Sequence, residues 1–150
     1  MDAGLRPYNS EDVEALYQLD QQCYPPGIAY SRREMKWYLR LPGADCLVAE
    51  GDGGIAGFII TEREHDLGHI VTLDVAEAQR RRGVGTALLG AAEARMMEAG
   101  VRRVSLETAT DNAPAVAFWK KHGYRTVAVL KNYYMDKLDG TCASRKPSAT

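Results

Sequence analysis

Arg80-Arg81-Arg82-Gly83-Val84-Gly85-Thr86 is the most informative segment of this 150-residue chain. It follows the β-branched and apolar run His69–Val75, which predicts a strand, and it precedes a helical pattern of small and apolar residues that ends at Gly100. Two glycines let the backbone approach a ligand closely, and the first N–H groups of a helix are unpaired at its positive end. The segment therefore predicts an anion site, to which the arginines add phosphate-matching donors. A solvated basic loop is the alternative.

Two common phosphate-binding motifs do not match this segment. A Walker loop needs Gly-Lys-Ser/Thr after four spacer residues, and the chain contains no such sequence. The dinucleotide-binding fingerprint needs a glycine or alanine at its sixth position, where the run from Gly83 has Leu88. Neither of these two classes of protein is therefore indicated.

Apolar periodicity on both sides of the segment predicts a mixed α/β sheet. Upstream, the expected elements are a strand at 5–8, helices at 11–23 and 31–41, and a hairpin of strands at 46–50 and 55–60. Downstream, they are a strand at 101–108, a helix that begins at 111–114, and strands at 124–130 and 133–138. The polar segment 139–150 is expected to be a flexible tail, which leaves 1–138 as a single domain.

Composition and charge exclude several classes of protein. Hydrophobic residues make up 45% and charged residues 26%, which is typical of a globular domain with a sizeable core. The formal net charge of -1 gives no field for binding nucleic acid or an anionic membrane. Three widely spaced cysteines match neither a zinc site nor a disulfide framework. With no apolar signal or membrane-spanning run, we expect a cytoplasmic protein with reduced thiols.

Two segments together resemble the motifs of one family. Val75–Leu89, with Arg80-x-x-Gly83-x-Gly85 at its centre, resembles the acetyl-CoA motif of the GNAT N-acetyltransferases. Asn112-x-x-Ala115-x-x-Phe118-Trp119-x-x-x-Gly123-Tyr124 is similar to the second motif of that family. Their order and separation also agree, and the layout of the family covers roughly residues 5 to 138.

Within this family the chain is most similar to the RimI-like N-acetyltransferases of ribosomal-protein N-termini. The similarity lies in residues 69–75, 106–108 and 132–134. It implies the GNAT (acyl-CoA N-acyltransferase) fold, a mixed and mostly antiparallel sheet of about six to seven strands flanked by about four helices. It also implies acetyl-CoA as the cosubstrate, with no metal.

The resemblance assigns cofactor contacts to two parts of the chain. The backbone of Leu73, Asp74 and Val75 is expected to hold the pantetheine arm where the fourth strand separates from the fifth. The pyrophosphate is expected to bind N–H groups of the following turn, with Arg80, Arg81, Arg82, Gly83, Val84, Gly85 and Thr86. Asn112 has two interpretations, because it either contacts the arm or caps a helix.

Acetyl transfer needs a neutral amine, a stabilised oxyanion and a proton for the thiolate. Glu107 is the expected base, because the matching glutamate is the proposed base of RimI-like enzymes and alternation turns it away from the face of Val104 and Leu106. A solvated charge is the alternative. His69, which begins the adjacent strand, is the competitor, ahead of the other two histidines. The oxyanion donor is expected to be the Val75 N–H.

The general acid departs from the family pattern. A Tyr often follows the position of Phe118, but this chain has Trp119, whose indole can orient the sulfur and cannot supply a proton. Tyr133 is the expected substitute, since a phenol can donate and accept. Tyr124, Tyr134, water or the released amine proton are the alternatives.

The acceptor is expected to be a protein or peptide N-terminus, then a lysine side chain, then a small amine. The loop Tyr24–Tyr30 is expected to shape its groove together with the last hairpin. Direct attack in a ternary complex is expected, because no cysteine has a catalytic partner at a recognisable spacing. A non-catalytic acyl-CoA sensor is the competing class, which Trp119 favours. The protein is expected to be a monomer or a homodimer.

Overall fold

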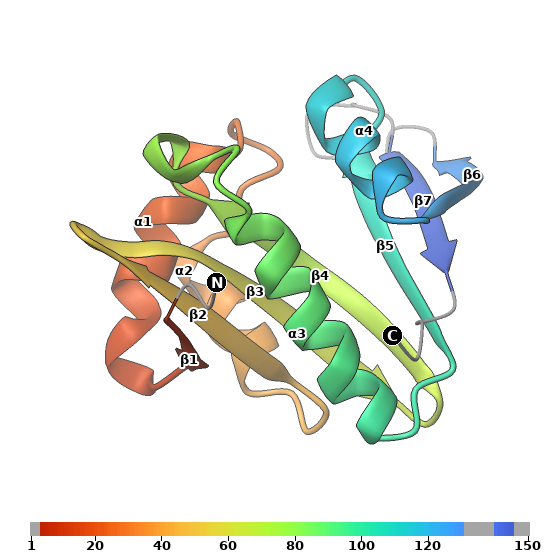
Figure 1. Cartoon of the computed structure of the whole chain (residues 1–150), viewed down its shortest axis with the longest axis horizontal. Coiled ribbons are helices and arrows are strands. Elements are labelled where there is room, and N and C mark those ends of the chain that lie inside the picture. Colours follow the sequence, from red (N-terminus) through yellow and green to blue (C-terminus); the bar gives the residue numbers. More distant parts are fainter. Residues whose placement is uncertain (1–3, 131–139, 146–150) are drawn as a thin grey trace.

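A twisted seven-stranded sheet forms the middle layer of the computed structural model, which describes residues 4–130 and 140–145 (Figure 1). The strands are β1 (Leu5–Pro7), β2 (Asp45–Gly51), β3 (Gly54–Glu64), β4 (Leu67–Val75), β5 (Arg103–Ala109), β6 (Arg125–Leu130) and β7 (Gly140–Arg145). The helices are α1 (Val13–Cys23), α2 (Arg32–Leu39), α3 (Val84–Glu98) and α4 (Ala113–Lys121), with short 3-10 helices η1 (Ser10–Asp12) and η2 (Glu77–Gln79).

The strand order across the sheet is β1-β2-β3-β4-β5-β7-β6. Every neighbouring pair is antiparallel except β4 and β5, which run parallel and are connected through η2 and α3. The mixed, mostly antiparallel sheet with four helices that the sequence predicts is therefore confirmed.

The last strand lies where the sequence predicts a tail. Gly140–Arg145 forms β7 and pairs with both β5 and β6, so the expectation of a flexible segment from residue 139 is wrong for these six residues. The predicted partner of β6 was 133–138, which lies outside the described residues. A polar sequence can fill this position because a strand with neighbours on both sides satisfies its backbone through the ladder, whatever its side chains.

Side-chain caps set the helix boundaries that the sequence indicates. Asn9 accepts a hydrogen bond from the Glu11 N–H at the start of η1, and the Ser31 hydroxyl accepts one from the Glu34 N–H at the start of α2. Asn112 Oδ1 accepts from the Ala115 N–H at 3.2 Å and begins α4. These caps satisfy N–H groups that the first helical turn leaves unpaired.

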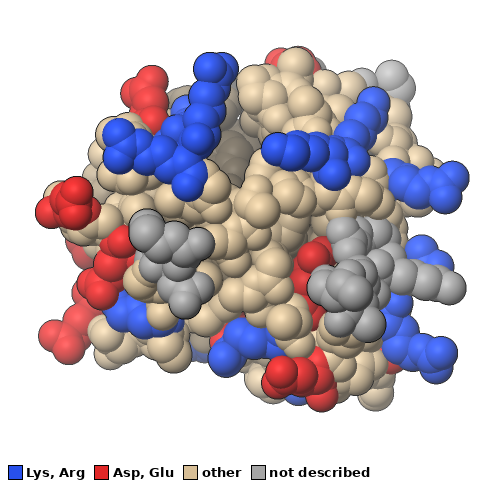
Figure 2. Space-filling view, viewed as in Figure 1, with Lys and Arg blue, Asp and Glu red and all other residues tan. Residues whose placement is uncertain are grey.

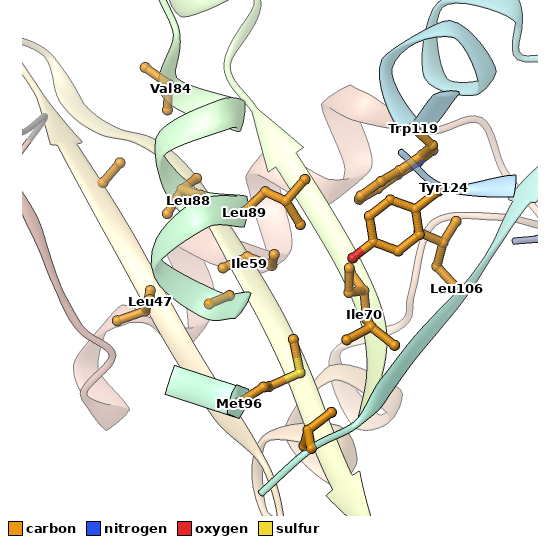
Figure 3. Packing of buried hydrophobic residues seen from close by; sticks show 14 of the residues in the cluster. Leu47, Ile59, Ile70, Val84, Leu88, Leu89, Met96, Leu106, Trp119 and Tyr124 are labelled. Atoms are coloured by element: carbon orange, nitrogen blue, oxygen red, sulfur yellow. The ribbon is translucent and has the colours of Figure 1, made fainter. Parts of the chain in front are cut away.

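Two hydrophobic clusters cover the two faces of the sheet. On one face α3 buries Val84, Leu88, Ala92 and Met96, spaced four residues apart, against β2, β3 and β4. Figure 3 shows this cluster, with the residues of α3 directed at the strands and Trp119 and Tyr124 closing its far end. On the other face, residues of α1 and α2 pack on Val48, Phe58, Ile60 and Val71.

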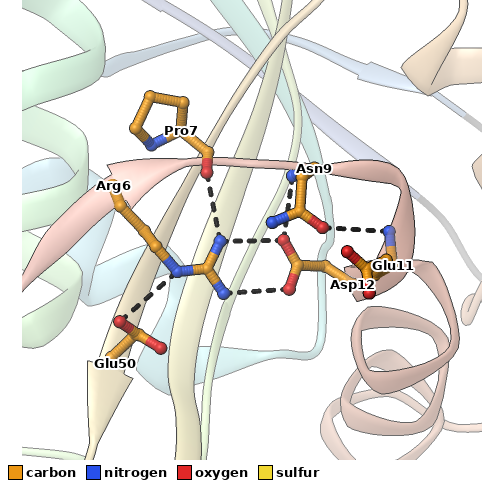
Figure 4. Close-up of polar contacts among 6 residues, drawn as sticks. All are labelled: Arg6, Pro7, Asn9, Glu11, Asp12 and Glu50. Atoms are coloured by element: carbon orange, nitrogen blue, oxygen red, sulfur yellow. Dashed lines mark hydrogen bonds and ion pairs between the residues drawn. The ribbon is translucent and has the colours of Figure 1, made fainter.

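A partly buried ion pair joins β1 to η1 (Figure 4). The Arg6 guanidinium donates two hydrogen bonds to the Asp12 carboxylate, at 2.8 and 2.9 Å, and its Nε lies 3.4 Å from Glu50 Oε1. The Asn9 N–H also donates to Asp12. Because of the Arg6 hydrogen bonds, the pKa of Asp12 lies below its usual value. This pair fixes the direction in which the chain enters α1.

Within the described residues, no helix has both the length and the apolarity needed to cross a bilayer.

Candidate active site

The strands β4 and β5 separate part-way along their length. They pair only over Leu67–Ile70 and Arg103–Leu106. Directly after Ile70 the register of β4 against β3 shifts, so that Val71 is an extra residue on β4. A bulge of this kind bends its strand, while β5 continues along β7. The two strands therefore diverge toward α4, as Figure 1 shows.

A cleft of about 350 Å³ lies where the strands diverge. Its walls are β4, the connection between α1 and α2, the end of β5 and the first two turns of α4. Seven residues expected to act in catalysis or cofactor binding line it: Leu73, Val75, Arg80, Gly85, Glu107, Asn112 and Trp119. Segments far apart in the sequence thus meet around one cavity.

The edge of β4 that faces the cleft has peptide groups outside the β-ladder. The carbonyl of Val71 accepts from the Tyr30 hydroxyl at 3.2 Å, and that of Leu73 accepts from the Tyr24 hydroxyl at 2.8 Å. The carbonyl of Val75 accepts from Arg80 Nε at 3.2 Å. Since the N–H and C=O of one strand residue point to the same side, the N–H groups of Leu73 and Val75 also face the cleft.

Asp74 differs from its two neighbours. Asp74 is not one of the residues that line the cleft. Its side chain is buried on the face of the sheet that α1 covers. Alternation directs its backbone toward β3, where it stands opposite Phe58. The expectation that Asp74 contributes to the cofactor edge along with Leu73 and Val75 is therefore not supported by this geometry.

The predicted anion turn has a helix start that no side chain caps. Gly83 is the N-cap of α3 with a φ of +82°, a conformation that glycine adopts without strain. No side chain accepts the first N–H groups of α3 at this cap. Gly85 lies close to both walls, because a Cβ there would be 3.4 Å from the Phe118 ring and 3.5 Å from Val75.

Basic side chains flank the entrance of the cleft. Figure 2 shows Lys and Arg on both sides of a hollow, over the start of α3 and over α4. Arg80–Arg82 precede α3, and Lys120 and Lys121 end α4. Thr86 Oγ1 lies 3.1 Å from His122 Nε2 and joins the two sides. Arg81, Arg82, Gly83, Val84 and Thr86 do not line the cavity itself, and the Val84 side chain is buried in the core.

Glu107 and His69, which the sequence presents as competitors, form one hydrogen-bonded unit. Glu107 Oε1 lies 2.7 Å from His69 Nε2, and His69 Nδ1 lies 3.3 Å from Glu62 Oε1. Glu107 lines the cleft, whereas His69 and Glu62 do not. The alternation predicted for β5 is confirmed, since Val104 and Leu106 are buried and Glu107 is half-buried.

The charges around His69 favour its protonated form. Burial opposes the imidazolium, but the hydrogen bond and charge of Glu107, together with Glu62, outweigh it and raise the pKa of His69 above its usual value. The imidazolium of His69 therefore lies between two carboxylates, and the carboxylate of Glu107 is the one that lines the cleft and can accept a proton from it.

The aromatic residues near the sulfur position have structural partners. Trp119 lines the cleft but is 8% exposed, and it packs edge-to-face with Phe118 and Tyr124. The Tyr124 hydroxyl donates to Glu93 Oε2 on α3 at 2.7 Å, so it is directed away from the cleft. Tyr133 and Tyr134 lie outside the described residues. Asn112 caps α4, while its amide N remains available at the cleft wall.

Sequence reasoning missed the roles of several side chains. The hydroxyl contacts of Tyr24 and Tyr30 with β4 link segments 41 to 49 residues apart, which no local pattern reveals. The strand predicted at 55–60 ends before Glu62, yet β3 continues to Glu64 and places Glu62 opposite His69 on the next strand. Asp20 and Asp74 interrupt apolar patterns, and this was a visible signal that each has a buried partner.

Comparisons with known proteins identify the family. Residues 13–124 match the model described as the acetyltransferase (GNAT) family. The chain belongs to the GNAT acetyltransferase family. It is 33% identical to an N-alpha-acetyltransferase of Sulfurisphaera tokodaii, over 90% of this chain and 87% of that protein.

Solved structures of GNAT proteins agree with the fold. The crystal structure of Ard1 from Thermoplasma volcanium has a TM-score of 0.88 and 28% identity, covering 96% of this chain and 97% of that one. The ribosomal-protein-S18-alanine N-acetyltransferase of Escherichia coli has a TM-score of 0.86 at 22% identity, over 97% and 94% of the two chains, and this likeness shows the shared fold. As a member of the family, the chain is an N-acetyltransferase with acetyl-CoA as its cosubstrate.

Proposed function

We propose that this GNAT protein acetylates the α-amine of a protein N-terminus. The observation that carries the proposal is the position of Glu107, whose carboxylate lines the cleft at the point where β4 and β5 separate. The family supplies the cosubstrate and the relative from Sulfurisphaera tokodaii supplies the class of acceptor.

The residues of the cleft suit acetyl-CoA. The N–H groups of Leu73 and Val75 would bind the pantetheine arm as an added strand does. The uncapped start of α3 with Gly83 and Gly85 would bind the pyrophosphate, and Arg80–Arg82 would add charge. The Asn112 amide would reach the arm from the opposite wall. A phosphate-binding turn and a free strand edge meet at one cavity, which is what an elongated thioester with a diphosphate needs.

Glu107 would remove the proton that the amine loses on attack. Acetyl-CoA supplies the thioester, whose C–S bond breaks as the C–N bond forms. The proton of the amine passes to Glu107, directly or through a water, while the hydrogen bond from His69 holds the carboxylate in position. The Val75 N–H would stabilise the oxyanion.

The CoA thiolate then needs a proton, and we propose the residue that donates it from the sequence. Trp119 would orient the sulfur, because the indole N–H donates a hydrogen bond without releasing its proton. Tyr133 stays the proposed acid. The Tyr24 hydroxyl is a poor source, since burial and the nearby Asp74 raise the pKa of Tyr24 well above its usual value.

An α-amine suits this base better than a lysine side chain does. The ordinary pKa of an α-amine is about 7.7 to 8.0, and that of lysine is about 10.4. At pH 7 roughly a tenth of an N-terminal amine is already neutral, compared with well under a thousandth of a lysine side chain, so that a carboxylate is a sufficient base for the N-terminus. A lysine ammonium would give up its proton to the same carboxylate far less readily.

Direct transfer to the amine is favoured over an acetyl-cysteine intermediate. Among the described residues, Cys23 is the cysteine that lines the cleft, and its thiol is free. Burial, with the charge of Asp74, raises the pKa of Cys23 to about 11. The thiol therefore stays protonated at neutral pH and is a weak nucleophile.

The connection between α1 and α2 would bind the acceptor. Tyr24, Ile28 and Tyr30 of this connection line the cleft opposite Glu107 and Thr108 of β5. We call residues 24–30 the acceptor loop. Free Cys23 and Cys46 fit the reducing cytoplasm that we propose as the location.

A peptide assay tests the proposal. A peptide with a free N-terminus and one internal lysine is incubated with acetyl-CoA, and the acetylated position is read by tandem mass spectrometry. The matched control has the same sequence with a blocked N-terminus. Acetylation of the α-amine in the first peptide and none in the second supports the proposal. Acetylation of the lysine in both peptides contradicts it.

A further inference from the structure

Two aspartates that the proposed chemistry does not use form a buried pair beneath the acceptor loop. Asp20 on α1 is 0% exposed and Asp74 on β4 is 1% exposed. Each carboxyl perturbs the pKa of the other, which places the two groups close together, and each has one buried oxygen without a donor among the described residues. Two neighbouring carboxyl groups can hydrogen-bond to each other only if one of them carries a proton, because an ionised carboxylate only accepts.

The other contacts of the pair leave one place for that proton. The Tyr30 N–H donates to Asp20 Oδ2 at 2.7 Å, and the Thr72 hydroxyl donates to Asp74 Oδ1 at 2.6 Å. The remaining oxygens, Asp20 Oδ1 and Asp74 Oδ2, are buried and meet no donor among the described residues. A proton on one carboxyl supplies the missing donor and removes one of the two buried charges.

The charges near the pair do not replace that proton. Cys23 and Tyr24, at the end of α1, present groups that stay neutral, since burial raises the pKa of both. Glu34 on α2 adds negative charge, and Arg80 beyond η2 adds positive charge. Arg80 is exposed and donates to the Val75 carbonyl. Burial, together with Asp20, therefore raises the pKa of Asp74 well above its usual value.

The pair connects the acceptor loop to the cleft edge of β4. Asp20 binds the backbone of Tyr30 at the end of the loop, and Asp74 belongs to the strand whose carbonyls accept from Tyr24 and Tyr30. We propose that Asp20 and Asp74 share one proton and thereby position the acceptor loop against β4, so that loss of this proton loosens the loop and weakens acceptor binding. The second half of this statement rests on the proposed function of the loop.

One substitution at Asp20 can keep a hydrogen bond to Asp74 without the need for a shared proton. In Asp20→Asn the side-chain oxygen can still accept from the Tyr30 N–H, and the amide can donate to an ionised Asp74. Asp20→Leu keeps the branching at Cγ and can do neither. Comparing the two separates hydrogen bonding from filling of space.

Two measurements separate opening of the acceptor loop from its proposed role in acceptor binding. Hydrogen exchange of the Tyr30 amide, relative to its intrinsic rate, reports opening of the loop without any substrate. The KM for a free N-terminal peptide, measured with kcat and with acetyl-CoA affinity, reports acceptor binding. Both are measured from about pH 6 to about pH 9, where an aspartate of ordinary pKa would not titrate.

In the wild-type protein, protection of the Tyr30 amide from hydrogen exchange is expected to fall, and the KM for the peptide to rise, as the pH approaches about 9. Asp20→Asn is expected to keep both values, and Asp20→Leu to show about tenfold higher KM at every pH, because a buried charge-assisted bond is lost. Acetyl-CoA affinity and kcat are expected to change less. If Asp20→Leu does not fold, the comparison of Asp20→Asn with wild type is sufficient.

Equal protection of Tyr30 in wild type and Asp20→Asn at every pH would overturn the shared proton. Altered protection with an unchanged peptide KM would support the shared proton and its hold on the loop, and would instead contradict the assignment of acceptor binding to the loop.

Discussion

Glu107 is the first residue of β5 beyond its parallel pairing with β4, and its carboxylate is 2.7 Å from the imidazole of His69 on β4. The two residues therefore span the point at which the strands separate. The bulge at Val71 opens the sheet, and this hydrogen bond closes the end of the opening. The proposed base is thus held by both strands, so that its position is set by the sheet.

The His69–Glu107 pair predicts a pH-dependent stability. The pKa of His69 is raised in the folded protein, so the stabilisation is complete below the ordinary histidine pKa of about 6.5 and is lost as pH rises through the raised value. His69→Gln should lower the melting temperature more at about pH 6 than at about pH 9. Thermal melts across this range measure it, with the exposed His65→Asn as control. A His69→Gln effect that does not vary with pH would contradict the pair.

The close approach of α3 to the cleft predicts that Gly85 has no room for a branched side chain. A Cβ at Gly85 would already be in contact with Phe118 at 3.4 Å, so the two further methyl groups of Val would take up space at the start of the helix. Gly85→Val should therefore weaken acetyl-CoA binding at least tenfold, on the order of 1.4 kcal/mol. Titration calorimetry measures this. Gly90→Val is the matched control, because Gly90 lies on the same helix with nothing within 4 Å of the added Cβ.

The Arg6–Asp12 pair predicts the opposite response to acid. Its hydrogen bonds lower the pKa of Asp12, so the stabilisation is present above the ordinary carboxyl pKa of about 3.9 and is lost as pH falls through the lowered value. Asp12→Asn should reduce the free energy of unfolding by about 1 to 3 kcal/mol at neutral pH. Urea unfolding of both proteins would show the difference shrinking in acid. A difference that grows in acid would rule out this role.

The sequence predicted those parts of the fold that depend on local patterns. The predicted helix starts near residues 11, 31 and 112 agree with the caps at Asn9, Ser31 and Asn112, and the glycines of the basic turn indicate a helix start that approaches a ligand. The exception is β7, whose polar residues carry no apolar alternation because its place between β5 and β6 comes from backbone pairing.

The candidate site was predicted in its components and not in its connections. Glu107 and His69 were both visible, but only the register of β4 on β5 brings them together. Asp74 was grouped with Leu73 and Val75 as one backbone segment, whereas pleating separates it from them. Asp20 and Asp74 are 54 residues apart in the chain, so their pairing depends on how α1 packs on the sheet.

The most direct measurement is the rate at which Glu107→Gln acetylates a free N-terminal peptide. The substitution keeps the size of the side chain and removes its capacity to take a proton. Glu64→Gln, an exposed change at the end of β3, is the matched control. We predict a kcat/KM about 100-fold or more below wild type, with unchanged acetyl-CoA affinity and a control equal to wild type. A Glu107→Gln protein that acetylates the peptide at the wild-type rate would contradict the role of this cleft carboxylate as the base.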